Sequence, residues 1–270
     1  MTEVKRKEAA ASLRPLPSTR KSLKRLIEFQ GVTLGYRSNI VLADLSFAVQ
    51  EGEFFGIVGA NGSGKTTILR AMLGILAPKA GRILFDGSNG RMRFGYVPQR
   101  AVIDEMFPLT AREIVVMGRY ALLPPGRRPT ANDRRVAEQQ LEHVGIGDLA
   151  DKRFRDMSGG QKQRTLFARA LAAEAKVLLM DEPTDGMDLE GQQAILDLIR
   201  ALRVESGVTV VYVTHRLNEL ADSAERLLLL HEGDVRVGPV DELLTPAVLR
   251  EMYGVEATVE HVAGKRVIVT

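Results

Sequence analysis

A glycine-rich loop at residues 59–66 has the spacing of a phosphate-binding loop, G-x-x-x-x-G-K-[ST]. Glycine lets the backbone take positive φ, so successive N–H groups can turn inward around an anion. An apolar strand precedes this loop and a helix follows it, so the positive end of that helix would face the same anion. We expect Lys65 to reach the β- and γ-phosphates of a nucleotide and Thr66 to bind Mg²⁺. The predicted nucleotide-contacting residues here are Gly59, Ala60, Asn61, Gly62, Ser63, Gly64, Lys65, Thr66 and Thr67.

Two adjacent carboxylates, Asp181 and Glu182, follow the apolar residues 177–180. An unpaired charge at the tip of a buried strand is costly, whereas α/β sheets place ligand chemistry at the carboxyl ends of their strands. Asp181 can hold magnesium directly or through water. Glu182 would point the opposite way along the pleat, where it can act as a general base on an attacking water. The plainer interpretation is a solvated acidic turn before Pro183.

A third element, the signature segment, covers residues 157–164 and reads Met-Ser-Gly-Gly-Gln-Lys-Gln-Arg. Ser158 is a good N-cap for a helix, and the two glycines after it permit close approach of another backbone. Taken alone, the segment is only a capped helix. It nevertheless supplies a second hydroxyl, a second set of N–H groups and a second helix N-terminus suited to an anion.

The apolar patterns place these loops on an alternating framework of strands and helices. Residues 26–34, 41–42 and 45–49 alternate as half-buried antiparallel strands do, and residues 54–58 form a continuous apolar strand suited to the middle of a sheet. A helix is predicted from Lys65 to about Leu76. Later elements are strands at 82–85, 93–97, 177–180, 208–213 and 226–230, helices starting at Gly160 and at Gly191, and a short helix before the last strand. This alternation implies right-handed crossovers and a largely parallel sheet.

Helical patterns at residues 110–117 and 131–144 interrupt the alternation. Thr130 and Asp133 make a capping pair at the start of the second helix. We interpret residues 100–160, approximately, as a helical subdomain inserted into a larger α/β domain that spans residues 23–240. The tail, residues 241–270, is predicted to form a small helix and two strands. The predicted fold class is α/β, with a P-loop NTPase core on a mostly parallel sheet, an antiparallel β subdomain and the inserted α-helical subdomain.

Composition sets further limits on the function. The chain has 270 residues, of which 45% are hydrophobic and 26% charged, as in an ordinary globular protein. It has no cysteine, which excludes disulfides and thiolate metal sites. No apolar run approaches the roughly 18–20 residues that span a bilayer, so any work at a membrane would be done from outside the lipid.

The net charge of +3 is unevenly distributed along the chain. Residues 1–25 carry eight Lys or Arg and two Glu, so the remainder is slightly acidic. We therefore expect no nucleic-acid partner. Residues 1–22 are predicted to be a basic, disordered arm, with attraction to acidic lipid or to a partner protein as the alternative.

Two anion-binding elements and a strand that ends in Asp-Glu resemble the ATP-binding cassette (ABC) family, over nearly the whole chain from about Leu23 to His231. In that family the signature segment contacts the γ-phosphate held by a partner subunit, so two cassettes enclose two ATP molecules. The resemblance implies that this chain works as a homodimer. The residues expected to contact the partner's ATP are Ser158, Gly159, Gly160 and Gln161. Met157 stands where the family usually has leucine, a change between apolar side chains from which we expect little effect.

Four more positions match motifs of the same family. Tyr36 stands where an aromatic ring stacks on adenine, and Gln99 matches the Q-loop glutamine, which joins the magnesium shell and senses the membrane subunits. Asp188 matches the D-loop at the dimer seam, and His215 matches the switch histidine that contacts the γ-phosphate. Alone, a tyrosine or histidine at a strand end would be structural. The resemblance implies a catalytic set of Lys65, Gln99, Glu182 and His215, and a magnesium set of Thr66, Gln99 and Asp181.

The resemblance implies an ATPase that energises a membrane transporter through ATP-driven dimer closure and reopening upon hydrolysis. Contact with integral membrane permease subunits is expected near residues 99–113. Residues 107–110, 116–120 and the Gly-Met-Asp of the D-loop are most similar to importers of manganese, zinc or iron chelates. That reading implies a solute-binding protein in the same system and a cytoplasmic subunit on the inner face of the cell membrane. The alternatives are an ABC exporter of lipid or another compound, a soluble ABC ATPase without a transport role, and a phosphate-binding module without turnover, which Glu182 disfavours.

Overall fold

The computed structural model describes residues 24–86, 92–99, 107–262 and 264–269. Its larger sheet has six strands in the order β5-β6-β7-β3-β8-β9. Their bounds are β3 Phe54–Gly59, β5 Phe94–Val97, β6 Val177–Asp181, β7 Thr209–Thr214, β8 Arg226–His231 and β9 Asp234–Pro239. All neighbours pair in parallel except β9, which runs antiparallel to β8. Strands β3, β6 and β7 are wholly buried, which explains why their sequences are continuous apolar runs.

A second, three-stranded antiparallel sheet lies beside the first, in the order β2-β1-β4. Its strands are β1 Arg25–Tyr36, β2 Asn39–Gln50 and β4 Ala80–Phe85. The two short runs predicted at 41–42 and 45–49 are one strand, β2. The pairing register shifts between Leu42 and Leu45, and Asp44 between them has φ +53, which breaks the alternation of the sequence pattern.

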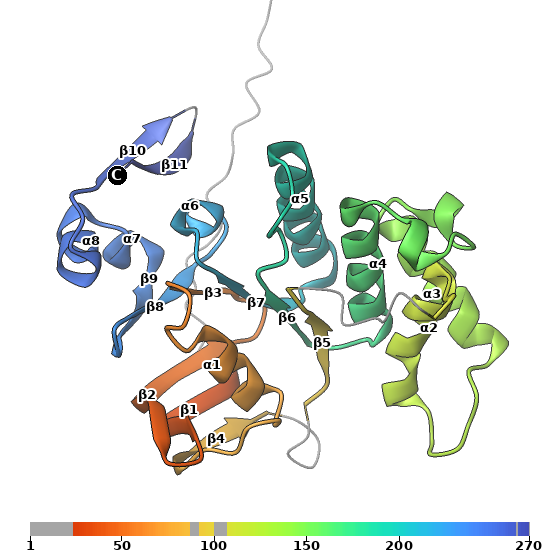
Figure 1. Cartoon of the computed structure of the whole chain (residues 1–270), viewed down its shortest axis with the longest axis horizontal. Helices are drawn as coiled ribbons and strands as arrows, with labels where there is room; N and C mark the ends of the chain where they lie inside the picture. Colours follow the sequence, from red (N-terminus) through yellow and green to blue (C-terminus); the bar gives the residue numbers. More distant parts are fainter. Residues whose placement is uncertain (1–23, 87–91, 100–106, 263, 270) are drawn as a thin grey trace, which may run out of the picture.

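The six-stranded sheet has two apolar faces, each with its own core. On one face Phe55, Ile57 and Leu179 pack with helix α1 (Lys65–Met72) and the antiparallel sheet. On the other face Phe54 and Tyr212 pack with α4 (Gly159–Ala172) and α5 (Leu189–Ser206). Figure 1 shows α1 between the two sheets, and α4 and α5 on the far side of the strands. This layered α/β arrangement confirms the predicted fold class.

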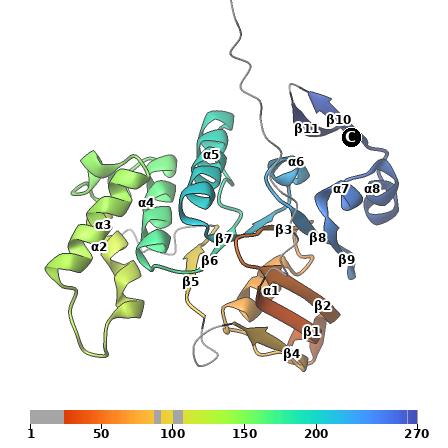
Figure 2. The same ribbon diagram turned by 180° about the vertical axis from the view of Figure 1, so that it is seen from behind.

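The helical part forms a lobe at one side of the large sheet, which Figure 2 shows beyond α5. It contains α2 (Ala111–Met117), a 3₁₀ turn (Gly118–Leu122) and α3 (Ala131–His143), packed on α4. The predicted capping pair is confirmed, because the Thr130 hydroxyl accepts from the Asp133 N–H and the Asp133 carboxylate accepts from the Thr130 N–H. Buried Arg119 ties the lobe together: it donates to Asp133 at 3.0 Å and to the Ala172 carbonyl at the end of α4 at 2.8 Å.

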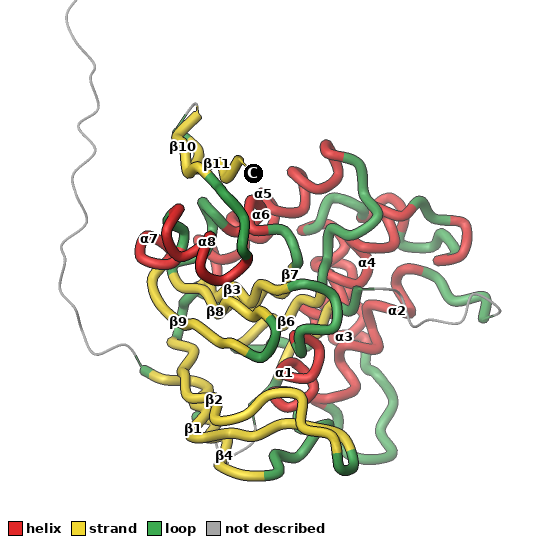
Figure 3. The backbone as a smooth tube through the Cα atoms, turned by 60° about the vertical axis from the view of Figure 1, so that its left-hand side comes forward, coloured by secondary structure: helices red, strands yellow, loops and turns green. Residues whose placement is uncertain are grey.

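The chain ends in a small extension after the large sheet. Short helices α6 (Leu217–Leu220) and α7 (Val240–Leu243) flank the last two strands of the sheet, and α8 (Pro246–Tyr253) follows. The hairpin of β10 (Thr258–Val262) and β11 (Lys265–Val269) stands beyond them in Figure 3. Within the described residues, no helix is long and apolar enough to cross a membrane.

Two expectations about elements were wrong. Helix α1 ends at Met72 rather than near Leu76, because Gly74 takes φ +70 and its N–H bonds to the Ala71 carbonyl in a terminating turn. The sequence reasoning also missed β9, which returns antiparallel along β8 after a tight turn at Glu232 and Gly233. The predicted arm at 1–22 lies outside the described residues, as do residues 100–106 of the predicted helical subdomain, and the domain boundaries stay predictions.

Candidate active site

A cavity of about 500 Å³ lies at the carboxyl end of β3, where the phosphate loop (residues 59–66) begins. Parallel strands bring their carboxyl ends to the same edge of a sheet, so loops far apart in sequence meet there. The loops after β5, β6 and β7 contribute Gln99, Glu182 and His215 to this edge. The cavity is lined by Tyr36, Val41, Asn61, Gly62, Gly64, Lys65, Thr66, Thr67, Gln99 and Glu182.

The phosphate loop is shaped by one glycine and one lysine. Gly64 has φ +105, and a Cβ on it would lie 2.8 Å from Leu42 Cδ1, so a larger residue fits neither the backbone nor the space. Lys65 Nζ is buried and donates to the carbonyls of Gly59 at 2.8 Å and Ala60 at 3.0 Å. The loop therefore curls around its own ammonium group. The hydroxyl oxygen of Ser63 is buried there without a hydrogen-bond partner.

Glu182 is the centre of the polar contacts in the cavity. Its Oε1 lies 3.5 Å from Lys65 Nζ, with both side chains buried. Its Oε2 lies 3.1 Å from His215 Nδ1 and accepts from Gln99 Nε2 at 3.1 Å. The structure thus brings all four predicted catalytic residues together, Lys65, Gln99, Glu182 and His215.

The backbone of Glu182 corrects the expectation about its direction. Strand β6 ends at Asp181, and Glu182 follows it at φ +44, in the left-handed region that non-glycine residues rarely adopt. The alternation of a pleat therefore does not apply to it. The Glu182 N–H donates to the Val213 carbonyl of β7 at 2.8 Å, which fixes the turn. Such strain costs about 1–3 kcal/mol and concentrates at functional sites.

Asp181 lies beside Thr66, and its chemistry fits a hard cation. Burial raises the pKa of the Asp181 carboxyl, the Glu182 carboxylate raises it further, and Lys65 and a hydrogen bond from Thr66 oppose the rise. Two neighbouring carboxylates facing a single ammonium group would be relieved by a divalent cation. Carboxylate and hydroxyl oxygens are the ligands that Mg²⁺ prefers. Gln99 uses its amide nitrogen towards Glu182 and Asp185, so its oxygen is not consumed by these bonds.

Tyr36 stands at the rim of the same cavity, at the end of β1. Its hydroxyl accepts from Arg70 Nη1 at 3.0 Å, and the Arg70 guanidinium lies 5.9 Å from the ring centre. Hydrogen bonds from Thr67, foremost, and from Arg70 lower the pKa of the Tyr36 phenol. The ring is 39% exposed, so a face remains accessible for stacking on a flat ring.

The signature segment builds a separate cavity of about 490 Å³. The Ser158 hydroxyl accepts from the Gln161 N–H, and Gln161 Oε1 accepts from the Ser158 N–H, a capping box that starts α4. Asp188 lies in the same cavity and caps α5 by accepting from the Gly191 N–H at 2.8 Å. The residues lining it are Ser158, Gly159, Gly160, Arg164, Gly186, Met187, Asp188, Glu190, Gly191 and Ala194.

The two cavities share no lining residue, so the structure does not bring Ser158, Gly159, Gly160 or Asp188 to the phosphate loop of the same chain. Gly159 and Gly160 differ from Gly64 in another respect. Their φ angles are not positive, and a Cβ built on either would meet nothing within 4 Å. Among the residues that the structure describes, nothing requires glycine at these two positions.

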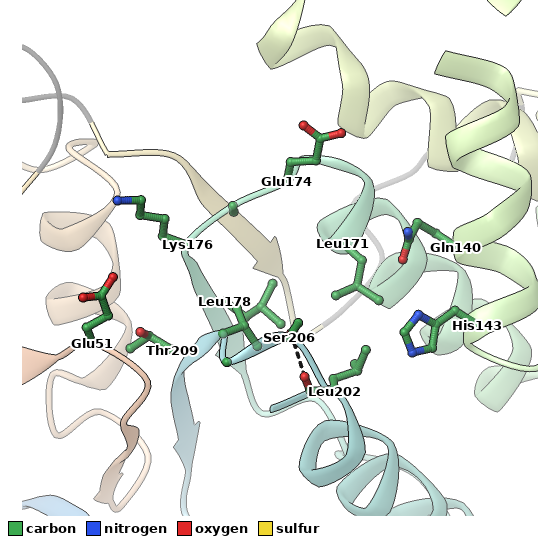
Figure 4. Close-up of a pocket in the computed structure, with 13 residues that line it drawn as sticks. Glu51, Gln140, His143, Leu171, Glu174, Lys176, Leu178, Leu202, Ser206 and Thr209 are labelled. Carbon is green, nitrogen blue, oxygen red and sulfur yellow. Dashed lines mark hydrogen bonds between the residues drawn. The ribbon is translucent and has the colours of Figure 1, made fainter. Parts of the chain in front are cut away.

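A third hollow, of about 410 Å³, lies at the opposite edge of the large sheet, where β6 and β7 begin. Figure 4 shows its apolar middle, formed by Leu171, Leu178 and Leu202, between Glu51, Lys176 and Thr209 on one side and Gln140 and His143 on the other. Strand amino ends are not where α/β sheets bind ligands, and none of the predicted site residues lies there.

The sequence reasoning missed two residues of the active site. Arg70 stands one turn beyond Thr66 on α1 and orients Tyr36. Asp185 accepts from Gln99 Nε2 at 3.2 Å, next to Glu182. The helical spacing from Thr66 could have indicated Arg70. Asp185 could not have been found, because its role depends on where the separate loop bearing Gln99 lies.

The mostly parallel sheet carries a phosphate loop with a buried lysine and a strained glutamate beside it, and a separate cavity holds the capped start of α4. Together these features define a P-loop ATPase of the cassette type. Residues 42–185 match the family described as ABC transporter. The chain belongs to this family, whose cassettes hydrolyse ATP.

Two relatives with named functions support this family assignment. The chain is 38% identical over 231 residues to the manganese transport system ATP-binding protein MntB of Bacillus subtilis. The matched region covers 84% of this chain and 92% of that relative. The chain is 36% identical over 231 residues to the zinc transport system ATP-binding protein TroB of Treponema pallidum, with 84% and 86% covered.

Two solved structures extend the likeness to three dimensions. The first is an ABC transporter assigned to the metal-chelate type, in an inward-facing conformation, with TM-score 0.82, 29% identity and coverage of 91% of this chain and 96% of that chain. The second is a dimeric ATP-binding cassette bound to ADP and phosphate, with TM-score 0.69, 29% identity and coverage of 80% and 99%.

Proposed function

We propose that this chain is the ATP-hydrolysing subunit of an ABC importer for manganese, zinc or a related metal ion or chelate. The observation that carries the hydrolytic part is the geometry of Glu182. A buried carboxylate held at 3.1 Å from both His215 and Gln99, next to a buried lysine, supports a role for Glu182 as the general base.

The chemistry follows from these contacts. Lys65 would exchange its bonds to the Gly59 and Ala60 carbonyls for the β- and γ-phosphates, whose charge it offsets. Water attacks the γ-phosphorus, and Glu182 takes the proton that the water loses, while ADP leaves. His215 and Gln99 hold the Glu182 carboxylate, and His215 would also contact the γ-phosphate. Thr66, Asp181 and Gln99 would hold Mg²⁺, which offsets phosphate charge when bound.

Two copies of the chain would share each active site. The signature segment presents a helix N-terminus and two unshielded glycines, but its cavity is separate from the phosphate loop. A helix N-terminus stabilises an anion. A second copy placed face to face would bring its phosphate loop to Ser158, Gly159, Gly160 and Gln161, with Asp188 at the seam.

The helical lobe offers a surface for the permease. A groove of about 620 Å³ runs between α2, the segment after the 3₁₀ turn and α3, with Met117 and Tyr120 exposed beside Arg128 and Arg134. Exposed Phe107 precedes it. The groove combines these apolar side chains with charges of both signs, since Glu113 and Asp151 line it together with the arginines, and it fits a cytoplasmic loop of the permease that presents apolar residues flanked by charged ones. The first part of the predicted contact, residues 100–106, lies outside the described residues.

The metal cargo is inferred from the names of the relatives, which are manganese and zinc transport ATP-binding proteins. An importer of this type implies a solute-binding protein and places the chain on the inner face of the cell membrane through its permease. Loss of the gene should abolish uptake of radioactive manganese or zinc, and restoring it should recover uptake. Unchanged uptake of both metals, with export of another compound reduced, would replace this assignment by an exporter.

Replacing Glu182 with Gln tests the hydrolytic role. Turnover should fall by about 10²–10⁴-fold because the amide cannot accept the proton. ATP should still drive dimer formation, because Lys65 and the loop are unchanged. Phosphate release and light scattering after size exclusion measure the two quantities, with Glu242→Gln, an exposed carboxylate on α7, as the matched control. Full turnover in Glu182→Gln would remove the proposed base.

The permease surface has its own test. Met117→Glu or Tyr120→Asp should leave ATP binding intact but abolish co-purification with the permease. Val204→Glu on α5, at a position that is 87% exposed and away from the groove, controls for a new surface charge. Undiminished co-purification of the groove variants would place the contact elsewhere.

A further inference from the structure

Glu219 of α6 is a buried carboxylate that the proposed chemistry does not use. It accepts hydrogen bonds from three hydroxyl groups: Thr184 at 2.9 Å, Tyr212 at 3.1 Å and Thr214 at 2.9 Å. The guanidinium of Arg216 lies 3.5 Å from it. A carboxylate taken out of water is costly unless its oxygens are satisfied, and here three donors from two segments, strand β7 and the loop after β6, satisfy it.

The protons in this cluster can be placed so that Glu219 accepts from all three hydroxyl groups. Each hydroxyl has a single proton to donate, and an ionised carboxylate can only accept. In this arrangement Thr184, Tyr212 and Thr214 all direct their protons at Glu219, and the hydroxyls of Thr184 and Tyr212 also lie 3.2 Å from each other. The Thr214 oxygen in turn accepts from the Arg216 N–H at 3.0 Å. Burial, and then the negative charge of Glu219, raises the pKa of the Tyr212 phenol well above its ordinary value, which keeps that group protonated as a donor.

The two threonines lie next to the active site. Thr184 is two residues after Glu182 and begins the segment that leads to Asp188, and its carbonyl accepts from the Met187 N–H. Thr214 directly precedes His215. On the cavity side Glu182 and His215 contact each other at 3.1 Å. On the core side, Glu219 joins the same two segments, which closes a ring of contacts.

We propose that Glu219 is a positioning residue that sets the loop 183–188 and His215 relative to each other. The contact that Asp188 makes with a second copy and the contact of His215 with the γ-phosphate would then move together. A change at the seam would reach His215 through Thr184, Glu219 and Thr214. This inference rests on the proposed roles of Glu182, Asp188 and His215.

Steady-state ATP hydrolysis by the full-length chain tests the proposal. In Glu219→Gln the amide nitrogen directs protons at hydroxyls that donate to Glu219 in the wild type, so at least one of these hydroxyls must redirect its proton and the ring of contacts is weakened. A misplacement of about 1 Å can cost on the order of 10²-fold in rate, so we expect kcat to fall about 10- to 100-fold. KM should change by less than about twofold, because the phosphate loop is untouched.

The threonines provide a second test, and the comparisons made with Glu219 present do not depend on a Glu219 variant folding. Thr184→Val should lower kcat, whereas Thr184→Ser, which keeps the hydroxyl, should restore it. The losses in Thr184→Val and Thr214→Val should be non-additive, although the two side chains are not bonded to each other, and should become additive when Glu219 is Gln. Thr209→Val is the matched control, since Thr209 is equally buried on β7 but its hydroxyl accepts from the Gly52 N–H away from this cluster.

The outcomes are distinguishable from failure of the proposed function. If Glu182→Gln or His215→Ala keeps full turnover, the proposed roles are wrong and the inference falls with them. If those variants lose turnover but Thr184→Val matches Thr184→Ser, or the threonine losses are additive with Glu219 present, the inference alone is overturned. A low kcat with unchanged KM and a threonine coupling that requires Glu219 would support it.

Discussion

The phosphate loop and the signature segment both present a helix N-terminus to an anion, but they are built differently. At the start of α1 no side chain caps the helix, and Gly64 holds a left-handed backbone against Leu42. At the start of α4, Ser158 and Gln161 form a complete capping box, and Gly159 and Gly160 face open space. The first helix start needs its glycine to fold, while the second has glycines that its own fold does not require.

The difference indicates which interactions each segment serves. Lys65, Glu182, Gln99 and His215 converge on the phosphate loop, so that half of the site is complete within one chain. In the part of the chain that the structure describes, Asp188 and its neighbours and Arg164 line the cavity of the signature segment, and none of the four residues that converge on the phosphate loop does. Because Gly159 and Gly160 have no side chains, the segment leaves room for a ligand from outside the chain. In our proposal this ligand is ATP held by a second copy.

The largest difference between the two segments is expected when one key residue of each is substituted and both turnover and nucleotide affinity are measured. Lys65→Ala removes the buried ammonium group and should lower turnover by at least about 10²–10³-fold, with loss of nucleotide affinity in the single chain. Ser158→Arg should also stop turnover, but the single chain should still bind ATP, because its phosphate loop is intact. Phosphate release and fluorescent-nucleotide titration measure the two effects.

Mixing these two variants sharpens the comparison. A dimer of one Lys65→Ala copy and one Ser158→Arg copy has one site with both Lys65 and Ser158 intact. The mixture should therefore recover turnover that neither variant shows alone. A mixture as inactive as its components would contradict a site shared between copies.

The glycines should give a smaller and opposite pair of effects. Gly64→Ala should destabilise the fold by about 1–3 kcal/mol, because alanine at φ +105 is strained and its Cβ meets Leu42. Gly160→Ala should leave stability unchanged or raise it by about 0.5–1 kcal/mol, since alanine favours a helix, yet weaken ATP-driven dimerisation. Urea unfolding measures the stability of each variant, and light scattering measures its dimerisation. Equal destabilisation by the two substitutions would contradict the proposed difference between the two helix starts.

The smallest expected effect is a loss of folding stability at low pH in the helical lobe that packs on α4. Hydrogen bonds from the Thr130 side chain and backbone, and then from Arg119, lower the pKa of Asp133 to about 2 from an ordinary value of 3.8. The ionised form is favoured in the folded state, so its stabilisation is complete above about pH 4 and is lost as the pH falls towards 2.

The thermal midpoint of the wild type minus that of Asp133→Asn should therefore be constant above about pH 4 and shrink below it. Asp197→Asn, on the exposed surface of α5, should show a much weaker trend. A difference that does not vary with pH would contradict the role of the ionised Asp133.

Much of the site could be predicted because its residues follow apolar strands directly. Lys65, Glu182 and His215 each lie within a few residues of a buried run that is recognisable from its composition, and parallel pairing does the rest. The left-handed backbone of Glu182 could not be predicted, because the Val213 carbonyl that fixes it belongs to another strand.

Residues that act through distant partners were missed for the same reason. Glu219 reads as an ordinary solvated residue on a short helix, and its burial depends on Thr184, which lies 35 residues earlier. Strand β9 was missed although Val235 and Val237 alternate after a glycine turn, because so short a pattern has little weight without its partner β8. Gly74 was a signal for the end of α1 at Met72. The apolar periodicity up to Leu76 was given more weight, so the helix was predicted too long.

The open space around Gly159 and Gly160 has a genetic consequence. A residue change there would leave the subunit fully folded, so the variant would accumulate to normal abundance and compete for every permease. In a cell that also makes the normal subunit, each mixed assembly would contain one defective and one intact site, so the allele would lower transport in proportion to its dose and would act semi-dominantly. A change at Gly64 lowers the amount of folded subunit instead, so the normal copy would fill most assemblies and the allele would be recessive.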